Sequence, residues 1–321
     1  MRMVRLGAAA AVTAVLSAAC SVHGEPPAPQ PITIVTGWTG GAFYPLGAAL
    51  AEIYNREIPG MQATAMLTGA SAFNVQAIQS GKAELGFSQG DVAYSAFKRG
   101  LEKGEAPYSR LRSMAVIYVN TAQFLVRKAS GIRSLADLRG RRVGVGGEPG
   151  SGTETAARTI IESYGLSYND IQPAFGSFGE AAEGLRSGRL DAALLVTSYP
   201  VSAITEIYEP ARVELLSVDE EAVHRIRSRF PFFKTVIIPR GTYRGQTGDI
   251  RTIGVDNLLI CLDSLPESLV YDMTRLLFES LPRLAQDHVT ARMIDAQQAP
   301  ATPIPLHPGA ARYYRERELF Q

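Results

Sequence analysis

The chain has 321 residues, of which 46% are hydrophobic and 20% are charged. This is the composition of a globular protein, so a disordered or fibrous chain is excluded, and the length suits about two domains with a large core. Lys and Arg number 32 against 31 Asp and Glu, without a basic run, so the sequence carries no electrostatic footprint for nucleic acid.

Residues 1–19 have the pattern of a secretory signal peptide: two arginines precede a short apolar run, which ends in small residues before Cys20. The run is too short for a transmembrane helix. The small residues before Cys20 resemble a bacterial lipobox, although Ser17 stands where such sequences prefer Leu. We expect a periplasmic protein that is anchored through a lipidated Cys20, with plain cleavage near Ala19 or Gly24 as the alternative.

The segment 20–31 is rich in proline and is expected to be an extended spacer after the anchor. Cys261 lies in the apolar run 257–262, where it is expected to be a small buried hydrophobe. The two cysteines offer no disulfide framework, and the four histidines are scattered without metal-ligand spacing. The sequence therefore predicts no metal site.

From residue 32 onward, apolar runs alternate with helical patterns. Strands are predicted at 32–36, 63–67, 85–88, 114–119, 124–127, 142–145, 192–196, 213–218, 235–238 and 257–262. Helices are predicted at 43–54, 73–80, 154–164, 180–187 and 266–284, with an irregular strap at 299–308 and a short polar helix at 310–319. Strands that alternate with helices indicate parallel α/β sheets.

The sequence also contains a faint internal echo. Residues 77–85 and 184–192 share a helix end, a glycine and the start of a strand, at an offset of 107 residues. The same offset roughly aligns two pairs of loops, 37–41 with 146–152 and 68–71 with 175–178. We expect two α/β lobes of similar build that face each other across a cleft.

The lobe limits follow from where the chain is expected to cross between the lobes. Lobe one is expected to contain residues 32–122 and 253–321, and lobe two residues 123–252. Two strands that cross between the lobes would form a hinge, and closure would shift an existing equilibrium.

Three loops rich in Gly, Ser and Thr each enter a predicted helix, at 38–43, 68–71 and 150–153. Unpaired backbone N–H groups at a helix start attract anions, and small residues let a ligand approach. One such loop alone could be no more than a capped helix start. Three together predict a site for a carboxylate, phosphate or sulfonate that needs no Arg.

Nucleotide and nucleophile motifs in the third loop are incomplete. The segment 147–153 resembles a Walker A loop but lacks the Lys that holds the phosphates. The segment 144–149 resembles a dinucleotide fingerprint, but Pro149 replaces the third Gly. Ser151 lacks the glycine spacing of a nucleophile elbow, and no His has a sequence reason to lie beside it. We therefore expect no cofactor and no enzyme activity.

At these loops the sequence resembles a known family. The segment Gly37-Trp-Thr-Gly-Gly-Ala-Phe-Tyr-Pro-Leu-Gly47 is similar to the opening motif of the TAXI family, the extracytoplasmic solute receptors of TRAP transporters. Later blocks resemble the same family at 68–74, 81–91, 135–143, 150–152, 191–200, 238–243 and 270–271. The resemblance, which covers about 32–285, implies a type II-like, two-lobed periplasmic binding protein fold. It also implies delivery of a ligand to an integral-membrane permease driven by an ion gradient.

Two departures from the family pattern leave the ligand open. Trp38 stands where the family usually has a small residue, and Thr197-Ser-Tyr199 precedes Pro200 where the family often has a Gly. Both place bulky aromatics at expected cleft positions, so the ligand can differ from the family's glutamate-like or dicarboxylate examples. In other TRAP receptors an Arg pairs with the ligand carboxylate. No motif places Arg127 in that role, and a surface Arg is the preferred interpretation.

The expected ligand-binding residues are Trp38, Thr39, Gly40, Phe43, Tyr44, Thr68, Ser71, Asn74, Gln89, Gly150, Ser151, Gly152, Thr153, Ser198 and Tyr199. The aromatics of the first loop would form a wall, and Thr68, Ser71 and Asn74 would donate to a polar head. Gln89 could read an amide or ammonium. The loop 150–153 would hold the anion from lobe two, while Ser198 and Tyr199 would close from the side. Phe43 could instead be core, and Asn74 could only brace its loop.

Three function classes remain open. The favoured one is a monomeric receptor for a small organic anion, such as an amino acid or carboxylate, that serves a TRAP permease. The alternative is a binding protein of an ATP-driven importer or a sensor kinase. The third is an exported enzyme, which would turn its ligand over where a receptor returns it unchanged.

Overall fold

A computed structural model describes residues 30–39, 41–208, 212–230 and 232–319. The predicted signal peptide, Cys20, most of the Pro-rich spacer and the candidate site residue Gly40 lie outside the described residues. Within the described part of the chain, no helix combines the length and apolarity needed to span a membrane.

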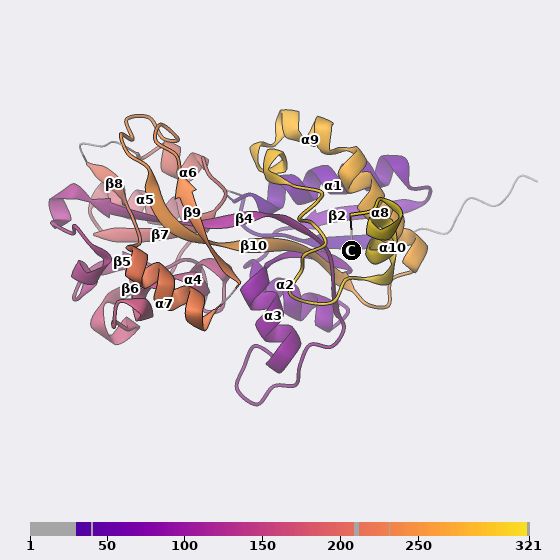
Figure 1. The fold of residues 1–321 in the computed structure, drawn as a ribbon, viewed down its shortest axis with the longest axis horizontal. Helices are drawn as coiled ribbons and strands as arrows, with labels where there is room; N and C mark the ends of the chain where they lie inside the picture. Colours follow the sequence, from indigo (N-terminus) through magenta and orange to yellow (C-terminus); the bar gives the residue numbers. More distant parts are fainter. Residues whose placement is uncertain (1–29, 40, 209–211, 231, 320–321) are drawn as a thin grey trace, which may run out of the picture.

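The described chain forms two lobes that are joined by two long strands (Figure 1). Lobe one contains β1 (Gln30–Val35), α1 (Phe43–Glu57), β2 (Met61–Met66), α2 (Ser71–Gln79), β3 (Leu85–Gln89), α3 (Gly90–Arg99), α8 (Glu267–Glu279), α9 (Leu281–Asp287), η4 (Val289–Met293) and α10 (Pro308–Glu316). Lobe two contains η1 (Lys128–Ser130), η2 (Leu135–Leu138), β5 (Arg142–Gly144), α4 (Gly152–Ser163), η3 (Tyr168–Asp170), β6 (Gln172–Ala174), α5 (Phe178–Ser187), β7 (Ala192–Thr197), α6 (Ser202–Thr205), β8 (Val213–Leu216), α7 (Glu220–Arg229) and β9 (Phe233–Ile238).

The joining strands are β4 (Leu111–Arg127) and β10 (Ile250–Leu262), which pair antiparallel along most of their length. The main strand order is β2-β1-β3-β10-β4-β7-β5-β6, while β8 pairs with β4 and β9 with β10. Within each lobe the short central strand has two parallel partners: β1 pairs with β2 and β3, and β5 pairs with β6 and β7. The carboxyl ends of these parallel strands meet where the lobes face each other, as expected for a ligand cleft.

The strand β4 replaces the two strands that were predicted at 114–119 and 124–127. Asn120 and Thr121 interrupt the apolar run between them, which suggests a break in the sequence. Both side chains are nevertheless buried, and the strand continues through them. The tertiary context thus overrides the local pattern.

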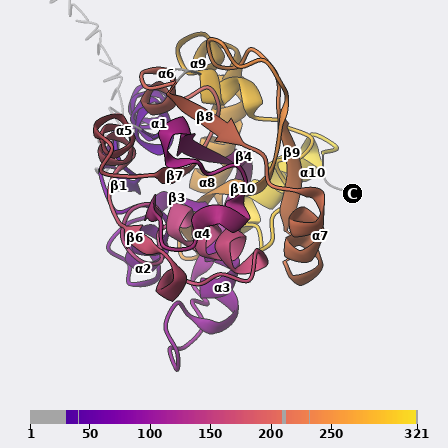
Figure 2. The same cartoon turned by 90° about the vertical axis from the view of Figure 1, so that its left-hand side faces the viewer.

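Each lobe has apolar clusters of its own on the faces of its sheet. On β4, the last residue of the lobe-one clusters is Tyr118, and on β10 the first is Leu258. The lobe-two clusters begin at Ala122 and reach Val255. In Figure 2, helices α5 and α7 lie on opposite sides of the lobe-two strands. The cores therefore divide on the crossing strands, and the exact lobe limits stay a prediction.

The internal echo corresponds to a repeated structural unit. Gly81 and Gly188, at the two echoed positions, both adopt left-handed backbone angles, with φ of 70° and 79°. Such angles favour glycine, because a Cβ atom is strained there. Helices α3 and α7 and strand β6 were not predicted, and the predicted helix at 266–284 is divided into α8 and α9.

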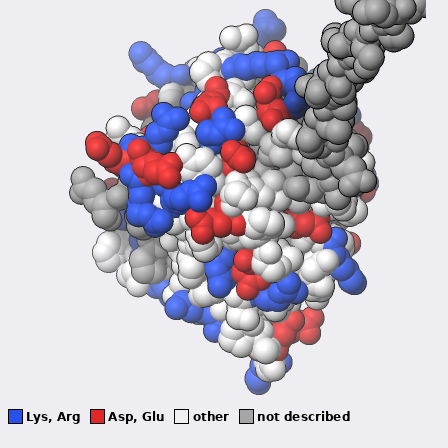
Figure 3. Space-filling model, turned by 90° about the vertical axis from the view of Figure 1, so that its right-hand side faces the viewer, with Lys and Arg blue, Asp and Glu red and all other residues white. Residues whose placement is uncertain are grey.

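The surface charge is mixed. Figure 3 shows one face of lobe one, where Lys and Arg are interspersed with Asp and Glu. Pairs such as Arg312 with Glu267 and Arg275 with Glu279 lie in this lobe. This face carries no single-sign field for a nucleic acid.

Candidate ligand site between the lobes

A pocket lies between the lobes and is partly open to solvent. Its walls come from the loops after β1, β2, β5 and β6, from the end of β3, and from β4 and β7. The lining residues are Gly37, Trp38, Gly41, Ala42, Phe43, Ala70, Ser71, Gln89, Tyr118, Asn120, Gly147, Ser151, Gly152, Thr153, Gly176, Phe178, Val196 and Thr197. None of these described residues is Asp, Glu, Lys or Arg, so hydrogen bonds and apolar contacts must do the binding.

Five helices begin at the pocket, and their first turns differ. One of them is α3, whose N-cap residue Gln89 lines the pocket and whose first turn contains Asp91. Helix α1 begins after Ala42 and helix α2 after Ala70; neither has a side-chain cap or an acidic residue in its first turn. In lobe two, Ser151 caps α4 and Ser177 forms a capping box with Glu180 at α5. Unpaired N–H groups at a helix start carry a partial positive charge, so the starts of α1 and α2, which have neither a cap nor an acid, are open to an anion.

The residue before α2 is held in an unfavourable conformation. Ala70 has φ of 69° and ψ of −141°, a region that residues other than glycine rarely adopt. Its N–H donates to Thr68 Oγ1 at 3.0 Å, and its carbonyl accepts from Asn74 N–H at 3.0 Å. This loop therefore holds the start of α2 at the pocket wall despite the backbone strain.

Aromatic side chains form the apolar part of the wall. Phe43 stacks on Phe87 with ring centroids 5.2 Å apart and meets Tyr118 edge-on at 6.4 Å. Burial raises the pKa of the Tyr118 phenol far above its usual range, so this hydroxyl is neutral. Phe178 lines the pocket from lobe two. Its ring lies close to the first loop of lobe one, because a Cβ atom added at Gly41 would be 3.8 Å from it.

Trp38 reaches across the mouth of the cleft. It lines the pocket, yet 43% of its surface is exposed. A Cβ atom added at Gly147 in lobe two would lie 3.5 Å from the indole Nε1. The close approach shows that the two lobes are closed over the pocket in this structure.

Gln89 joins the two lobes at the base of the pocket. Its Nε2 donates to the carbonyl oxygen of Gly152 in lobe two at 2.9 Å and to Asp91 Oδ1 at 3.3 Å, while its Oε1 accepts from Asn120 Nδ2 at 2.8 Å. Asn120 Nδ2 also donates to Asn257 Oδ1 at 3.0 Å. This fully buried chain of amides connects lobe one, both crossing strands and the start of α4.

The buried network leaves several polar atoms without a partner. Asn120 Oδ1, Asp91 Oδ2 and Asn257 Nδ2 form no hydrogen bond to any part of the chain that the structure describes. Burial raises the pKa of the Asp91 carboxyl to about 6, although hydrogen bonds from Gln89 and from backbone N–H groups oppose the shift. Buried polar groups without a hydrogen-bond partner are rare in folded proteins.

The structure brings seven of the predicted site residues together at the pocket. They are Trp38, Phe43, Ser71, Gln89, Ser151, Gly152 and Thr153. Their role in ligand binding stays a prediction. The side-chain amide of Gln89 already bonds to Gly152, Asp91 and Asn120, so it has less hydrogen-bonding capacity for the expected amide or ammonium group of a ligand.

Two predicted donors are engaged elsewhere. Thr68 Oγ1 donates to Asn74 Oδ1 at 2.7 Å and lies 3.0 Å from the Thr36 carbonyl. Asn74 Nδ2 donates to the carbonyls of Thr36 and Phe87 at 2.6 and 2.7 Å. Neither lines the pocket, so they brace the loop, which is the alternative that the sequence left open for Asn74.

Apart from Gly40, which lies outside the described residues, the remaining predicted residues are not among the pocket lining, and they include Thr39, Tyr44 and Gly150. Ser198 Oγ lies 3.1 Å from Thr290 Oγ1 on η4, so it contacts the other lobe away from the pocket. Tyr199 donates its hydroxyl proton to the Ile237 carbonyl at 3.3 Å. Both hydroxyls thus have protein partners in this structure, and the expectation that Ser198 and Tyr199 close on the ligand stays a prediction.

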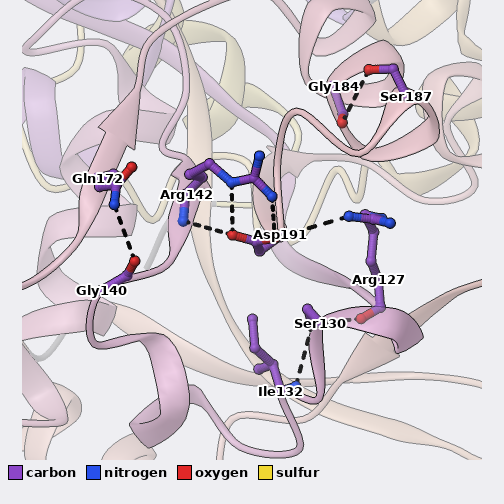
Figure 4. A network of polar contacts seen from close by, with 9 residues as sticks. All are labelled: Arg127, Ser130, Ile132, Gly140, Arg142, Gln172, Gly184, Ser187 and Asp191. Carbon is purple, nitrogen blue, oxygen red and sulfur yellow. Dashed lines mark hydrogen bonds and ion pairs between the residues drawn. The ribbon is translucent and has the colours of Figure 1, made fainter.

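Arg127 is committed to a structural ion-pair network in lobe two (Figure 4). Its Nη1 lies 4.0 Å from Asp191 Oδ1, and Arg142 contacts the same carboxylate through Nη2 at 2.6 Å and Nε at 3.0 Å. The hydrogen bonds from Arg142 lower the pKa of Asp191 below its usual range. Arg127 does not line the pocket, in agreement with the preferred interpretation.

Sequence reasoning missed four informative wall residues: Tyr118, Asn120, Phe178 and Thr197. The internal echo could have indicated Phe178, because the offset of 107 residues places it opposite Ser71. Asn120 stands out as an amide within an apolar strand. The orientation of Tyr118 on β4 could not be predicted, because it depends on where that strand crosses between the lobes.

Comparison with known proteins places the chain in a family. The model of the NMT1-like family matches residues 34–317, nearly the whole described chain.

In the described residues, no group of three His, Cys, Asp or Glu is placed to hold a metal ion.

Solved structures of low sequence identity share the fold. A structure described as a periplasmic transporter matches with a TM-score of 0.55 at 11% identity, over 90% of this chain and 93% of that one. A protein from Bordetella bronchiseptica RB50 matches with a TM-score of 0.53 at 16% identity, over 91% and 89%. The alkanesulfonate-binding protein SsuA from Xanthomonas axonopodis pv. citri bound to MOPS gives 0.49 at 16% identity, over 92% and 96%.

The two matches with TM-scores above 0.5 agree with the predicted two-lobed architecture. The family match shows the NMT1-like family. The more specific assignment to the TAXI receptors stays a prediction. With its mixed α/β, type II-like periplasmic binding protein fold, the chain belongs to the NMT1-like family.

Proposed function

We propose that this protein is an extracytoplasmic solute-binding receptor that captures a small organic anion, an amino acid or carboxylate among them, and delivers it to a membrane transporter. The pocket between the closed lobes carries this proposal. It is lined by neutral polar groups and aromatic rings, and helices begin at its walls. Such a site can hold an anion through backbone N–H groups without a side-chain cation.

The pocket offers binding groups but no recognisable catalytic pair. Ser151, the one residue that suggested a nucleophile, caps helix α4 by accepting from Glu154 N–H at 3.4 Å. No histidine is among the described residues that line the pocket. Return of the ligand unchanged is therefore the expected behaviour.

The transporter partner is either an ATP-driven importer or a TRAP permease. Two of the similarly folded proteins are described as parts of ABC transporters, one for sulfonates and one for an amino acid. The TRAP permease rests on the TAXI-like motifs alone. We therefore place the ATP-driven importer first, and a transport assay with each candidate permease, reconstituted with this receptor, distinguishes the two.

The location follows from the leader. We propose that the receptor works in the periplasm and is held at the membrane by a lipid on Cys20. The intact mass of the protein extracted from membranes tests this, because lipidation predicts a modified mature chain that begins at Cys20. An unmodified chain that begins elsewhere contradicts the anchor but leaves the receptor function standing.

A ligand screen tests the binding function. Binding to the native state raises the melting temperature by mass action, so carboxylates, amino acids, sulfonates, neutral sugars and amines are compared by thermal shift. Hits are then incubated with the protein, and their recovery is measured by mass spectrometry. A receptor returns the hit quantitatively, whereas steady conversion to a product would contradict the proposal.

A further inference from the structure

Two buried amides lie at the hinge between the lobes, where β4 and β10 cross (Figure 1). The apolar clusters of the two lobes leave a gap between them at residues 119–121 of β4 and 256–257 of β10. Asn120 lies in the first gap and Asn257 in the second, with 4% and 0% of their surface exposed. Hydrogen bonds between amides therefore replace apolar packing at the point where the lobes bend against each other.

The direction of this chain of amides is set at its lobe-one end. The carbonyl oxygen of Gly152 and the ionised carboxyl group of Asp91 only accept hydrogen bonds, so Nε2 of Gln89 must face both of them. Oε1 of Gln89 then faces Asn120, whose Nδ2 donates to it and to Oδ1 of Asn257. Each amide is thus oriented by its neighbour, and the order of donors and acceptors begins at the Asp91 carboxyl group.

Asp91 fixes the direction because the other end of the chain does not. Asp91 is buried in the first turn of α3, where a helix start favours a negative charge. At the far end, Nδ2 of Asn257 finds no acceptor among the residues that the structure describes. With all three amides reversed, Oε1 of Gln89 would face the carbonyl oxygen of Gly152, and two acceptors would repel each other. Only the observed direction lets the lobes join.

We infer that Gln89, Asn120 and Asn257 form a latch that holds the lobes together without a ligand, and that Asp91 is the positioning residue that keeps the Gln89 N–H turned toward lobe two. The latch uses only groups of the protein, so the ligand-free receptor already samples the closed form. A ligand then has a smaller cost of closure to overcome. The inference goes beyond the proposed function and is independent of which ligand the receptor takes.

The test measures closure in the absence of any ligand. The chain is produced without residues 1–19 and with Cys20→Ser, which prevents lipidation. Spin labels are attached at Gln76→Cys in α2 and Asn169→Cys in η3, two exposed positions in different lobes, while the buried Cys261 stays unlabelled. Pulsed electron resonance at pH 8, above the pKa of about 6 of the Asp91 carboxyl, gives the fractions of closed and open distances.

We expect a closed fraction in the original protein, and in Gln89→Glu a closing equilibrium constant that is about two- to tenfold smaller, because an acceptor then faces the Gly152 carbonyl. Gln246→Glu is the matched control, since this buried side chain forms its hydrogen bonds within lobe two, and its closed fraction should be unchanged. Only open distances in the original protein, or equal closure in Gln89→Glu, overturn the latch.

The role of Asp91 is tested with Asp91→Asn, whose side chain has the same shape but can either donate to the Gln89 amide or accept from it. The amides can then run in both directions, so closure should fall by about twofold or more, while urea unfolding shows a more stable fold. A purely structural role predicts instead that closure follows stability. Equal closure in Asp91→Asn and the original protein overturns the positioning role. Failure of the ligand screen would contradict the receptor function separately, because these measurements contain no ligand.

Discussion

Trp38 is the only tryptophan in the chain, and its indole stands at the mouth of the cleft. A bound ligand changes the water around the indole, and so does any movement of Gly147 in lobe two. We expect the tryptophan emission to change in intensity or in wavelength when a ligand from the screen is titrated in. The measurement is fluorescence with excitation selective for tryptophan, and Trp38→Phe is the silent control.

A lack of any emission change at saturation, with binding confirmed by calorimetry, would place the ligand away from the loop that contains Trp38. It would also weaken the assignment of that loop to the site. The partial exposure of the indole makes the experiment informative, because a fully buried ring would respond little.

Asp91 predicts a dependence of stability on pH. Burial raises its pKa from 3.8 to about 6 in the folded protein. The folded state therefore favours the protonated carboxyl, and this contribution is fully present below the pKa of the unfolded chain. It is lost as the pH rises through about 6, by up to about 3 kcal/mol for a shift of this size.

We expect Asp91→Asn, which stays neutral, to gain stability relative to the original protein between pH 4 and pH 7. Urea unfolding at several pH values measures the difference, and Asp287→Asn, at an exposed position, is the control. A stability difference between Asp91→Asn and the original protein that does not change with pH would contradict a raised pKa at this carboxyl.

At the scale of single elements, the turn at Gly188 ends α5 and starts the return to β7. Its φ is 79°, and a Cβ there would also come within 3.1 Å of the Arg127 guanidinium. We expect Gly188→Ala to cost about 1 to 2 kcal/mol of unfolding free energy. Gly131→Ala is the matched control, because Gly131 has a φ of 72° but no atom within 4 Å of the added Cβ.

Chemical denaturation of both variants separates backbone strain from crowding. The loss at Gly131 reports the strain alone, and any further loss at Gly188 reports the contact with Arg127. Equal stability of Gly188→Ala and the original protein would contradict the requirement for glycine at the echoed turn.

The elements that sequence patterns predict well are those with a strong local signal. The buried strands β3 and β7 and the helices α1, α4 and α5 have apolar spacing and turn residues that agree with their structure. Helix α7 was missed because its sequence is mostly polar, and its three buried residues give only a weak stripe. Helix α3 was missed because it follows β3 with no intervening loop.

The candidate site was predictable only in part, for a physical reason. Gly-rich loops before helices mark the carboxyl edge of a parallel sheet, which identified Trp38, Ser71 and Ser151. Tyr118 and Asn120 come to the same pocket through the crossing strand β4, whose pairing with β10 is a long-range property. The local sequence pattern around Tyr118 and Asn120 carries no information about this pairing.

At the scale of the whole molecule, the described chain passes between the lobes along β4 and β10. Closure brings Gly152, the first residue of α4, against the Gln89 side chain of lobe one. A Cβ added at Gly152 would lie 2.5 Å from Gln89 Cδ and 2.7 Å from its Oε1, which is closer than real contacts allow. Gln89 cannot easily move aside, because Asn120 and Asp91 hold its amide.

We therefore expect Gly152→Ala to keep the lobes from closing fully. The lost hydrogen bond and the overpacking together cost about 2 to 3 kcal/mol, so ligand affinity should fall by roughly 30- to 150-fold. Small-angle scattering should show that ligand reduces the radius of gyration of the original protein but much less that of Gly152→Ala at saturation. Gly248→Ala is the control, since nothing lies within 4 Å of its added Cβ.

The outcome separates closure from simple damage to the pocket. A variant that binds weakly yet compacts fully at saturation would show that residue 152 contacts the ligand and does not limit the hinge. One that binds and compacts like the original protein would contradict the contact between Gln89 and Gly152 as the point where the lobes meet. Weak binding together with an open form would connect affinity to the population of the closed state, because binding energy must then also overcome the cost of closure.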